Sequence, residues 1–237
     1  MGMRPALLPI VLACLLAGSG AALRGQQPLP LDRLAPGDRA QVQDILARAN
    51  FDFTSRTEPR RVGLGTMEKL FDHPRMSVAM WRQCQFVPPF YAQVSGPDRW
   101  NLDDLRGLRA ELHQVYARPG WRIYLVDGHV DRGWRGTPVA VTARMVASYR
   151  YWEGPKGYES EVHTWTALDS ALLGFMARPF YGVIHARQEE FIAYINSNIA
   201  VFGEAAELSP SDFLPRLRQE GDPEALKEYQ RLFGGRP

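Results

Sequence analysis

The sequence predicts an α+β domain in which a curved antiparallel sheet of about six to seven strands grips a long C-terminal helix. Three observations support this. Alternating apolar and polar residues, typical of strands, dominate from Phe86 to Leu168. Turn signals such as Pro119-Gly120 and Glu153–Gly157 separate the strand segments closely enough for hairpins. Apolar residues then recur at three- and four-residue steps from Asp169 to Gly203, which predicts an amphipathic helix that covers the sheet.

Residues 1–22 have the pattern of a cleavable secretory signal. Arg4 supplies a positive charge, Pro5–Leu16 is an uncharged apolar stretch, and Gly20-Ala21-Ala22 offers the small residues that signal peptidase requires. Because a spanning helix needs roughly 20 apolar residues, an N-terminal membrane anchor is the weaker alternative. We therefore expect a periplasmic or secreted protein with no transmembrane span after cleavage.

The two cysteines limit the chemistry further. Val11–Cys14 loosely resembles a lipobox, so lipidation at Cys14 is an alternative to cleavage near Ala22. Cleavage would leave Cys84 as the only cysteine, which excludes an intramolecular disulfide and any metal site built on CxxC pairs. We expect Cys84 to be a quiet, partly buried residue.

Charge argues against nucleic-acid binding. The chain has 28 Lys and Arg against 26 Asp and Glu, a formal net charge of +2. The basic residues are scattered and form no stripe interleaved with aromatic residues. We therefore expect no nucleic-acid partner.

Four segments follow from the composition. Residues 1–22 are the signal, 23–50 a proline-containing lead-in with an N-terminal helix that starts near Pro36, 51–203 the main domain, and 204–237 a helical tail. Helix-start signals in the tail occur at Ser209–Asp212 and Asp222–Glu224.

Within the main domain, residues 51–57 predict a first strand and residues 66–72 and 74–83 two short helices, with Thr66 as the N-cap of the first. Pro74 separates the helices. Further strands are predicted over 90–94, 100–105, 108–116, 121–126, 137–152 and 158–167. We expect Asp127-Gly128 to end the fourth of these, and Gly203 to end the long helix after a break at Pro179.

This order of elements resembles the START-like (SRPBCC, helix-grip) superfamily from about Phe51 to Gly203. The resemblance rests on element order and length, because the superfamily has no short invariant motif to match. It implies a hydrophobic pocket between sheet and helix that binds lipids, sterols or polyketide-like molecules, and some members are cyclases or hydrolases. The extra N-terminal helix and the helical tail depart from a minimal member and leave open whether the pocket entrance is free.

Aromatic and thioether side chains are the candidate ligand-binding residues, because such side chains bind apolar molecules well. The residues expected on the inner faces of the sheet and the long helix are Met145, Tyr149, Met176 and Phe180. Arg144 belongs to the opposite face of its strand. Ordinary core packing is the alternative role for the aromatic residues.

Several titratable residues are candidate catalytic or metal-binding groups. Glu161 and His163 share one face of the last strand, which could be an acid–base pair or simply a solvated face. Glu111 and His113 repeat that spacing and would form a metal site only if their strand lay beside the last one. Asp72-His73 is better explained as a helix-breaking corner.

We therefore expect a binding protein for a hydrophobic small molecule or lipid, with no cofactor and no metal. An enzyme that uses Glu161 and His163 on the same scaffold is one alternative. A non-catalytic envelope interaction protein, docking through its tail, is another. Phosphate-loop, Rossmann, nucleophile-elbow and zinc-protease motifs are absent from the sequence.

Overall fold

The computed structural model describes residues 28–86, 91–103, 105, 107–134, 137–169 and 181–234, and the unit that begins at Leu31 forms the fold. The expected signal and two of the four candidate ligand-binding residues, Met176 and Phe180, lie outside the described residues. Within the described ranges, no helix combines the length and the apolarity that a membrane crossing needs.

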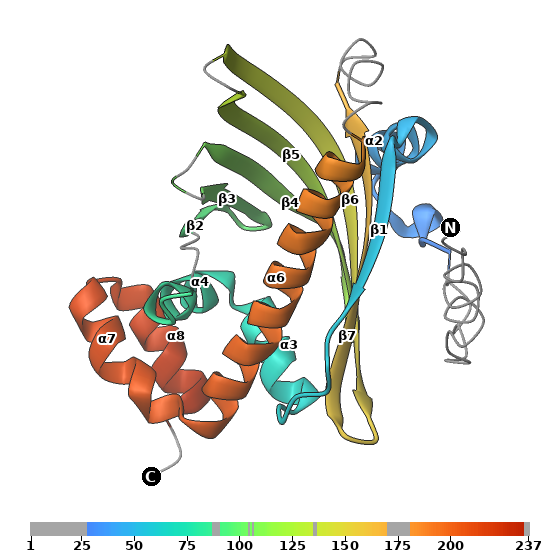
Figure 1. The fold of residues 1–237 in the computed structure, drawn as a ribbon. Coiled ribbons are helices and arrows are strands. Elements are labelled where there is room, and N and C mark those ends of the chain that lie inside the picture. The colour runs from blue at the N-terminus through green and yellow to red at the C-terminus, as the bar shows by residue number, and fades with distance from the viewer. Residues whose placement is uncertain are drawn as a thin grey trace, which may run out of the picture. The chain divides into compact units, whose positions relative to one another are not determined.

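The sheet has seven strands in the order β1-β7-β6-β5-β4-β3-β2, every neighbouring pair is antiparallel, and the sheet is curved and open (Figure 1). The strands are β1 (Phe51–Arg56), β2 (Tyr91–Gly96), β3 (Arg99–Asp103), β4 (Leu108–Arg118), β5 (Trp121–Trp134), β6 (Thr137–Gly154) and β7 (Gly157–Leu168). From β2 to β7 each strand follows its neighbour along the chain, whereas β1 joins the far side of β7. The predicted α+β class and antiparallel sheet are therefore confirmed.

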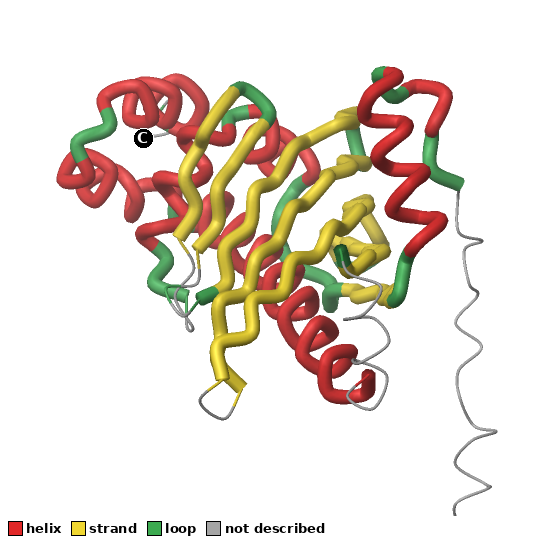
Figure 2. Tube along the Cα trace, turned by 90° about the horizontal axis from the view of Figure 1, so that it is seen from above, coloured by secondary structure: helices red, strands yellow, loops and turns green. Residues whose placement is uncertain are grey.

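Helices lie on both faces of the sheet. They are α2 (Pro36–Arg48), α3 (Leu64–Asp72), α4 (Pro74–Gln83), α6 (Tyr181–Leu208), α7 (Phe213–Glu220) and α8 (Pro223–Phe233), with the short 3₁₀ turns η1 (Leu31–Arg33) and η3 (Pro210–Asp212). The long helix α6 crosses the concave face and packs against β1 and β7, as predicted (Figure 1). Figure 2 shows the sheet between α6 and α2.

The position of α2 on the convex face explains a second set of buried residues. Helix α2 packs on β6 and β7 and buries Val42 and Ile45. On that face of the sheet Val146 is fully buried, and the Trp121 ring nitrogen donates to the Ser148 hydroxyl at 2.8 Å. The sheet is thus covered on both sides, although its alternation alone predicts one solvated face.

The predicted end of the fifth strand was wrong. Asp127 and Gly128 do not form a turn; β5 runs on to Trp134. Gly128 pairs with Ala110 on β4 and with Ala143 on β6. The turn propensity of Asp-Gly is overridden because ladder hydrogen bonds on both sides hold the chain extended.

Two predicted helix boundaries were also wrong. Helix α6 continues through Gly203 to Leu208, and α3 begins at Leu64 rather than at an N-cap Thr66. A side chain at Gly203 would collide with the Met67 sulfur of α3, so this glycine permits close helix packing. The Thr66 hydroxyl donates to Glu207 of α6 instead of capping its own helix.

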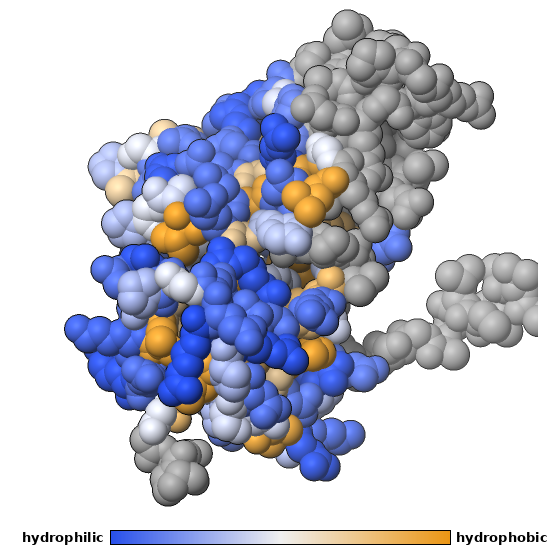
Figure 3. Space-filling view, turned by 90° about the vertical axis from the view of Figure 1, so that its left-hand side faces the viewer, coloured by the Kyte–Doolittle hydropathy of each residue, from blue (hydrophilic) through white to orange (hydrophobic). Residues whose placement is uncertain are grey.

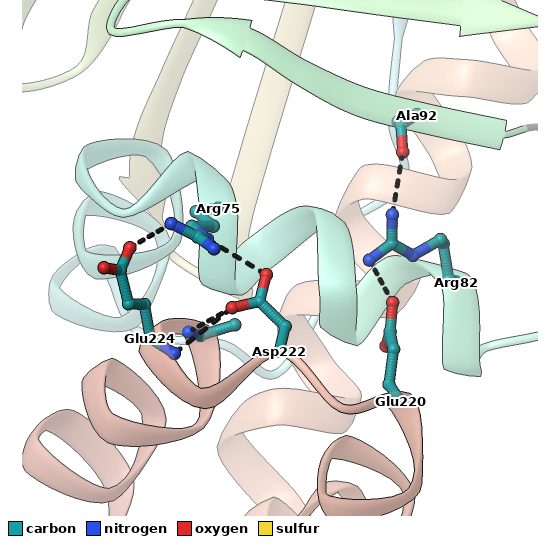
Figure 4. A network of polar contacts seen from close by, with 7 residues as sticks. Arg75, Arg82, Ala92, Glu220, Asp222 and Glu224 are labelled. Atoms are coloured by element: carbon teal, nitrogen blue, oxygen red, sulfur yellow. Dashed lines mark hydrogen bonds and ion pairs between the residues drawn. The ribbon is translucent and has the colours of Figure 1, made fainter.

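The C-terminal tail packs against α4 and belongs to the main core. Met76 and Met80 of α4 join Phe213, Leu217 and Tyr229 of the tail in one buried cluster. Acidic tail residues then meet basic residues of α4, as Figure 4 shows. These pairs are Arg75 with Asp222 at 2.9 Å, Arg75 with Glu224, and Arg82 with Glu220.

Candidate ligand-binding face

Side chains from four neighbouring strands, β3 to β6, form an apolar patch on the concave face. We call this the concave patch and define it as Trp100, Leu112, Tyr124 and Met145. Trp100 pairs with Leu112 across β3 and β4, and the Trp100 and Tyr124 rings meet edge to face at 6.0 Å. All four side chains are only half-buried, so each keeps accessible apolar surface. Met145 therefore lies where the sequence predicted, on the inner face.

Two polar groups belong to the same region. Gln114 pairs with Tyr124 across β4 and β5, so both side chains share the concave face. The Gln114 Oε1 atom is buried and has no hydrogen-bond partner in the part of the chain that the structure describes. Burial raises the pKa of the Tyr124 hydroxyl, which is therefore protonated and able to donate at neutral pH.

Tyr149 is buried more deeply than predicted and belongs to the hydrophobic core. It is 4% exposed, and its hydroxyl lies 2.6 Å from that of Tyr158. Burial raises the pKa of Tyr149 to about 12. Its ring is edge to face with Phe71 of α3 at 5.4 Å. Nearly all of the Tyr149 surface is already covered by the protein, so little of it can contact a ligand.

A series of buried hydrogen bonds between polar groups fixes α6 against the sheet. The Ser160 hydroxyl donates to the Asn196 side chain of α6 at 2.8 Å, and the Asn196 amide donates to the Ser55 carbonyl at 3.3 Å. Asn196 is fully buried. Because buried polar groups are costly unless paired, these bonds select one position of α6 on the strands.

Sequence reasoning missed an ionic cluster around a buried arginine at the other end of the concave face. Arg122 of β5 is 2% exposed and donates to Glu68 at 2.6 Å and to Asp72 at 2.8 Å, both on α3. Glu68 also accepts from the Tyr151 hydroxyl and the Gly120 amide, each at 2.8 Å. The signal in the sequence was the spacing of Glu68 and Asp72, which places two carboxylates on one helix face.

Glu161 and His163 lie on the convex face, opposite Met145 and Tyr149. The His163 ring stacks on Trp165 at 3.8 Å, and its Nε2 atom lies 3.8 Å from the Asp52 carboxylate. Burial lowers the pKa of His163, against the opposing effect of Asp52. Glu161 accepts from Arg56 at 2.6 Å. The structure thus places neither residue at the concave patch.

The other titratable pairs do not converge. Strand β4, which carries Glu111 and His113, pairs with β3 and β5 and not with β7, so a shared metal site with the last strand does not form. Asp72 binds Arg122, whereas His73 faces Glu228 at 3.4 Å, as expected for a helix corner. Across the described ranges, no cluster of three or more His, Cys, Asp or Glu residues is arranged to hold a metal ion.

Two cavities are defined by described residues. One of about 520 Å³ lies at the β2–β5 end of the sheet, with Arg82 of α4 on its wall. The other, of about 250 Å³, lies between the end of α4, α6 and α7. Neither of these two cavities is lined by Met145 or Tyr149.

Comparison with known proteins gives likenesses in structure alone. No family model and no curated protein matches the chain. A putative uncharacterized protein from Rhizobium leguminosarum is 10% identical over 65% of this chain and 94% of its own, with a TM-score of 0.42. A conserved protein from Geobacillus kaustophilus is 11% identical over 65% and 97%, with a TM-score of 0.43.

A di-domain ARO/CYC protein, BexL from the BE-7585A biosynthetic pathway, is 14% identical over 85% of this chain and 58% of its own, with a TM-score of 0.32. None of these TM-scores reaches 0.5. The helix-grip-like assignment therefore rests on the strand order and on the path of α6 across the concave face.

Proposed function

We propose that this protein binds a hydrophobic small molecule or lipid at the concave patch. The observation that carries the proposal is the half-buried state of Trp100, Tyr124 and Met145 on the concave face. Their neighbours Tyr149 and Val126 on the same face are buried. Apolar surface that the protein leaves accessible in a concave setting is surface that a ligand can cover.

Desolvation would supply most of the affinity. Covering apolar surface contributes about 25 cal/mol per Å², from which the cost of ordering the ligand is subtracted. The Tyr124 hydroxyl adds one donor to an otherwise apolar surface, whereas the Gln114 Oε1 atom on the same face is buried. A ligand that carries a hydroxyl group or a carboxylic acid would accept from the Tyr124 hydroxyl, and the position of that hydroxyl would then orient the ligand.

Fluorescence titration tests the proposal. A fatty acid, a phospholipid and a naphthalene dye are each titrated while tryptophan emission is followed. We expect a saturable change with at least one of them, and loss of the Trp100 contribution in Trp100→Leu. Met145→Lys should weaken binding at least about tenfold, because a charged group would have to be desolvated beside the ligand.

Leu208→Lys is the matched control, since Leu208 is 63% exposed at the end of α6 and does not belong to the concave patch. Circular dichroism establishes that each variant is folded. Binding that is absent with all three probes, or that Met145→Lys and Leu208→Lys weaken equally, would remove the concave patch as a binding site.

We propose in addition that residues 1–22 direct export and that the protein works in the periplasm or outside the cell. The support is the charge, apolar stretch and small residues of this segment. N-terminal sequencing of the protein recovered from the extracytoplasmic fraction tests this, with a new N-terminus near residue 23 as the expected result. An intact Met1 in a cytoplasmic fraction would contradict it.

A further inference from the structure

The cavity between the end of α4, α6 and α7, which we call the tail pocket, has the character of a second binding site. Its volume is about 250 Å³. It is separate from the concave patch, because none of its lining residues belongs to that patch. The residues that line it are Gln83, Cys84, Phe86, Val201, Phe202, Ala205, Ser209, Asp212, Phe213 and Arg216.

The inner wall of the tail pocket is apolar and held in place by aromatic packing. Phe202 and Phe213 are 4% and 6% exposed, and their rings meet at 6.3 Å. Trp81 braces this wall from behind, with ring contacts to Phe86 at 4.5 Å and to Phe202 at 5.9 Å. Phe202 and Phe213 are thus nearly covered by the protein, whereas the half-buried Phe86 ring keeps surface on which a flat ligand can pack.

The rim of the tail pocket is polar and carries both signs of charge. Asp212 and Arg216 are exposed, and Arg216 donates to the Gln83 carbonyl at 2.8 Å. The neighbouring Ser209 adds a hydroxyl group. A rim with one anion and one cation gives no net attraction to a charged ligand, but it can form a hydrogen bond with a polar substituent.

Cys84 contributes a neutral thiol to the wall. Its sulfur lies 3.6 Å from the Met80 carbonyl oxygen, and burial raises the pKa of the thiol to about 11 in spite of the nearby Arg216. At neutral pH the group is therefore protonated and behaves as a small apolar side chain. It also provides a chemical reporter inside the pocket.

The surface around the tail favours a small ligand over a protein partner. On the side of the molecule that Figure 3 shows, the exposed hydrophobic residues of the described chain form small patches that hydrophilic residues separate. The tail's own apolar residues Phe213, Leu217 and Tyr229 are buried against α4. These three apolar groups are thus recessed, and Leu208 is the one large apolar side chain exposed among the described tail residues, whereas a protein interface would present a broad continuous patch.

We propose that the tail pocket binds an uncharged aromatic molecule of one or two rings with one polar substituent. Size sets the number of rings, because a cavity of roughly 150 Å³ holds benzene and drug-sized ligands need about 300–1,000 Å³. The aromatic wall selects the flat shape, and the rim selects the polar substituent. A phospholipid or a long acyl chain would extend well beyond this volume.

Protection of Cys84 from alkylation by indole tests the proposal. The full chain with Cys14→Ser carries Cys84 as its only thiol, and N-ethylmaleimide labelling is followed by mass spectrometry. We expect indole to slow the labelling saturably, about tenfold at roughly ten times its Kd. Val201→Phe, which fills the pocket, should abolish the protection, and Ala205→Leu serves as a second filling variant should the first fail to fold.

Met145→Lys is the control that separates the two sites. It should leave the protection of Cys84 intact, whatever it does to binding at the concave patch. A labelling rate that indole does not change up to its solubility limit would overturn the proposal. Protection that persists in a folded filling variant would overturn it as well, because indole would then act from elsewhere.

Discussion

The guanidinium of Arg122 and the carboxylate of Glu68 form an ion pair at 2.6 Å that joins the start of β5 to α3. Arg122 is almost completely buried, whereas Glu68 keeps about a fifth of its side chain exposed. Helix α3 in turn contacts α6 through Gly203 and through Thr66. The ion pair therefore fixes α3, the helix against which α6 packs.

Glu68→Gln should destabilise the protein by about 1–2 kcal/mol, because a charge-assisted hydrogen bond to the buried Arg122 is weakened and Glu68 is partly solvated. The change leaves the Arg122 charge buried with Asp72 as its remaining carboxylate. Urea unfolding followed by circular dichroism measures the loss. Glu58→Gln, on an exposed loop, is the control and should change stability by less than about 0.5 kcal/mol.

Asp222 has two roles that two substitutions separate. It caps α8 by accepting from the Glu224 and Ala225 amides, and it pairs with Arg75. Asp222→Ala should cost about 1–2 kcal/mol because both are lost. Asp222→Asn should cost less, since the cap is kept. Equal losses in the two variants would show that the cap contributes nothing.

The Asp222 contribution also has a defined pH dependence. Burial opposes ionisation, but the hydrogen bonds from Arg75 and the backbone amides outweigh it and lower the pKa of Asp222 from 3.8. A lowered pKa means that the stabilisation is present above pH 3.8 and is lost as the pH falls through the folded-state value. The stability difference between wild type and Asp222→Asn should therefore shrink in acid.

Asn196→Ala should cost about 2–3 kcal/mol, because it empties a buried site and leaves the Ser160 hydroxyl without its acceptor. Ser160→Ala combined with Asn196→Ala should cost less than the sum of the single changes. Chemical denaturation of the four proteins measures the coupling. Strict additivity would mean that this bond does not fix α6 on the sheet.

Gly203→Ala should be destabilising by about 1–3 kcal/mol even though alanine favours helices, because the new methyl group meets the Met67 sulfur. Gly65, near the start of α3, has open space where a methyl group would lie, with no neighbouring atom within 4 Å. Gly65→Ala should therefore raise stability by about 0.5 kcal/mol through helix propensity alone. Thermal unfolding of both variants gives the comparison, and a stabilising Gly203→Ala would refute the packing argument.

The fold was predictable because its signals are local. Alternation along β6 and β7, the hairpin turn at Gly154–Gly157 and the long apolar repeat of α6 each identify an element without reference to its neighbours. Gly128 and Gly203 were misread for the opposite reason. At both positions tertiary contacts, a ladder on two sides and a close helix, override what glycine usually signals.

The candidate site was predictable only in part. Met145 lies on the inner face because strand alternation places it there, and the same rule places Glu161 and His163 on the other face once the strand order is known. Alternation predicts which face a side chain occupies but not how completely it is buried, which is why Tyr149 is buried more completely than expected. Burial of Arg122 depends on two carboxylates some fifty residues earlier; their spacing places both on one helix face, but no local pattern pairs that face with Arg122.

The hydrogen bonding of β1 to β7 joins segments more than a hundred residues apart. During synthesis β1 therefore emerges long before β7, its partner among the described strands, while β2 to β6 can pair successively from one hairpin to the next. Closure of so long a loop is slow. We therefore expect β1 to join the edge of β7 after the hairpins from β2 to β7 have formed.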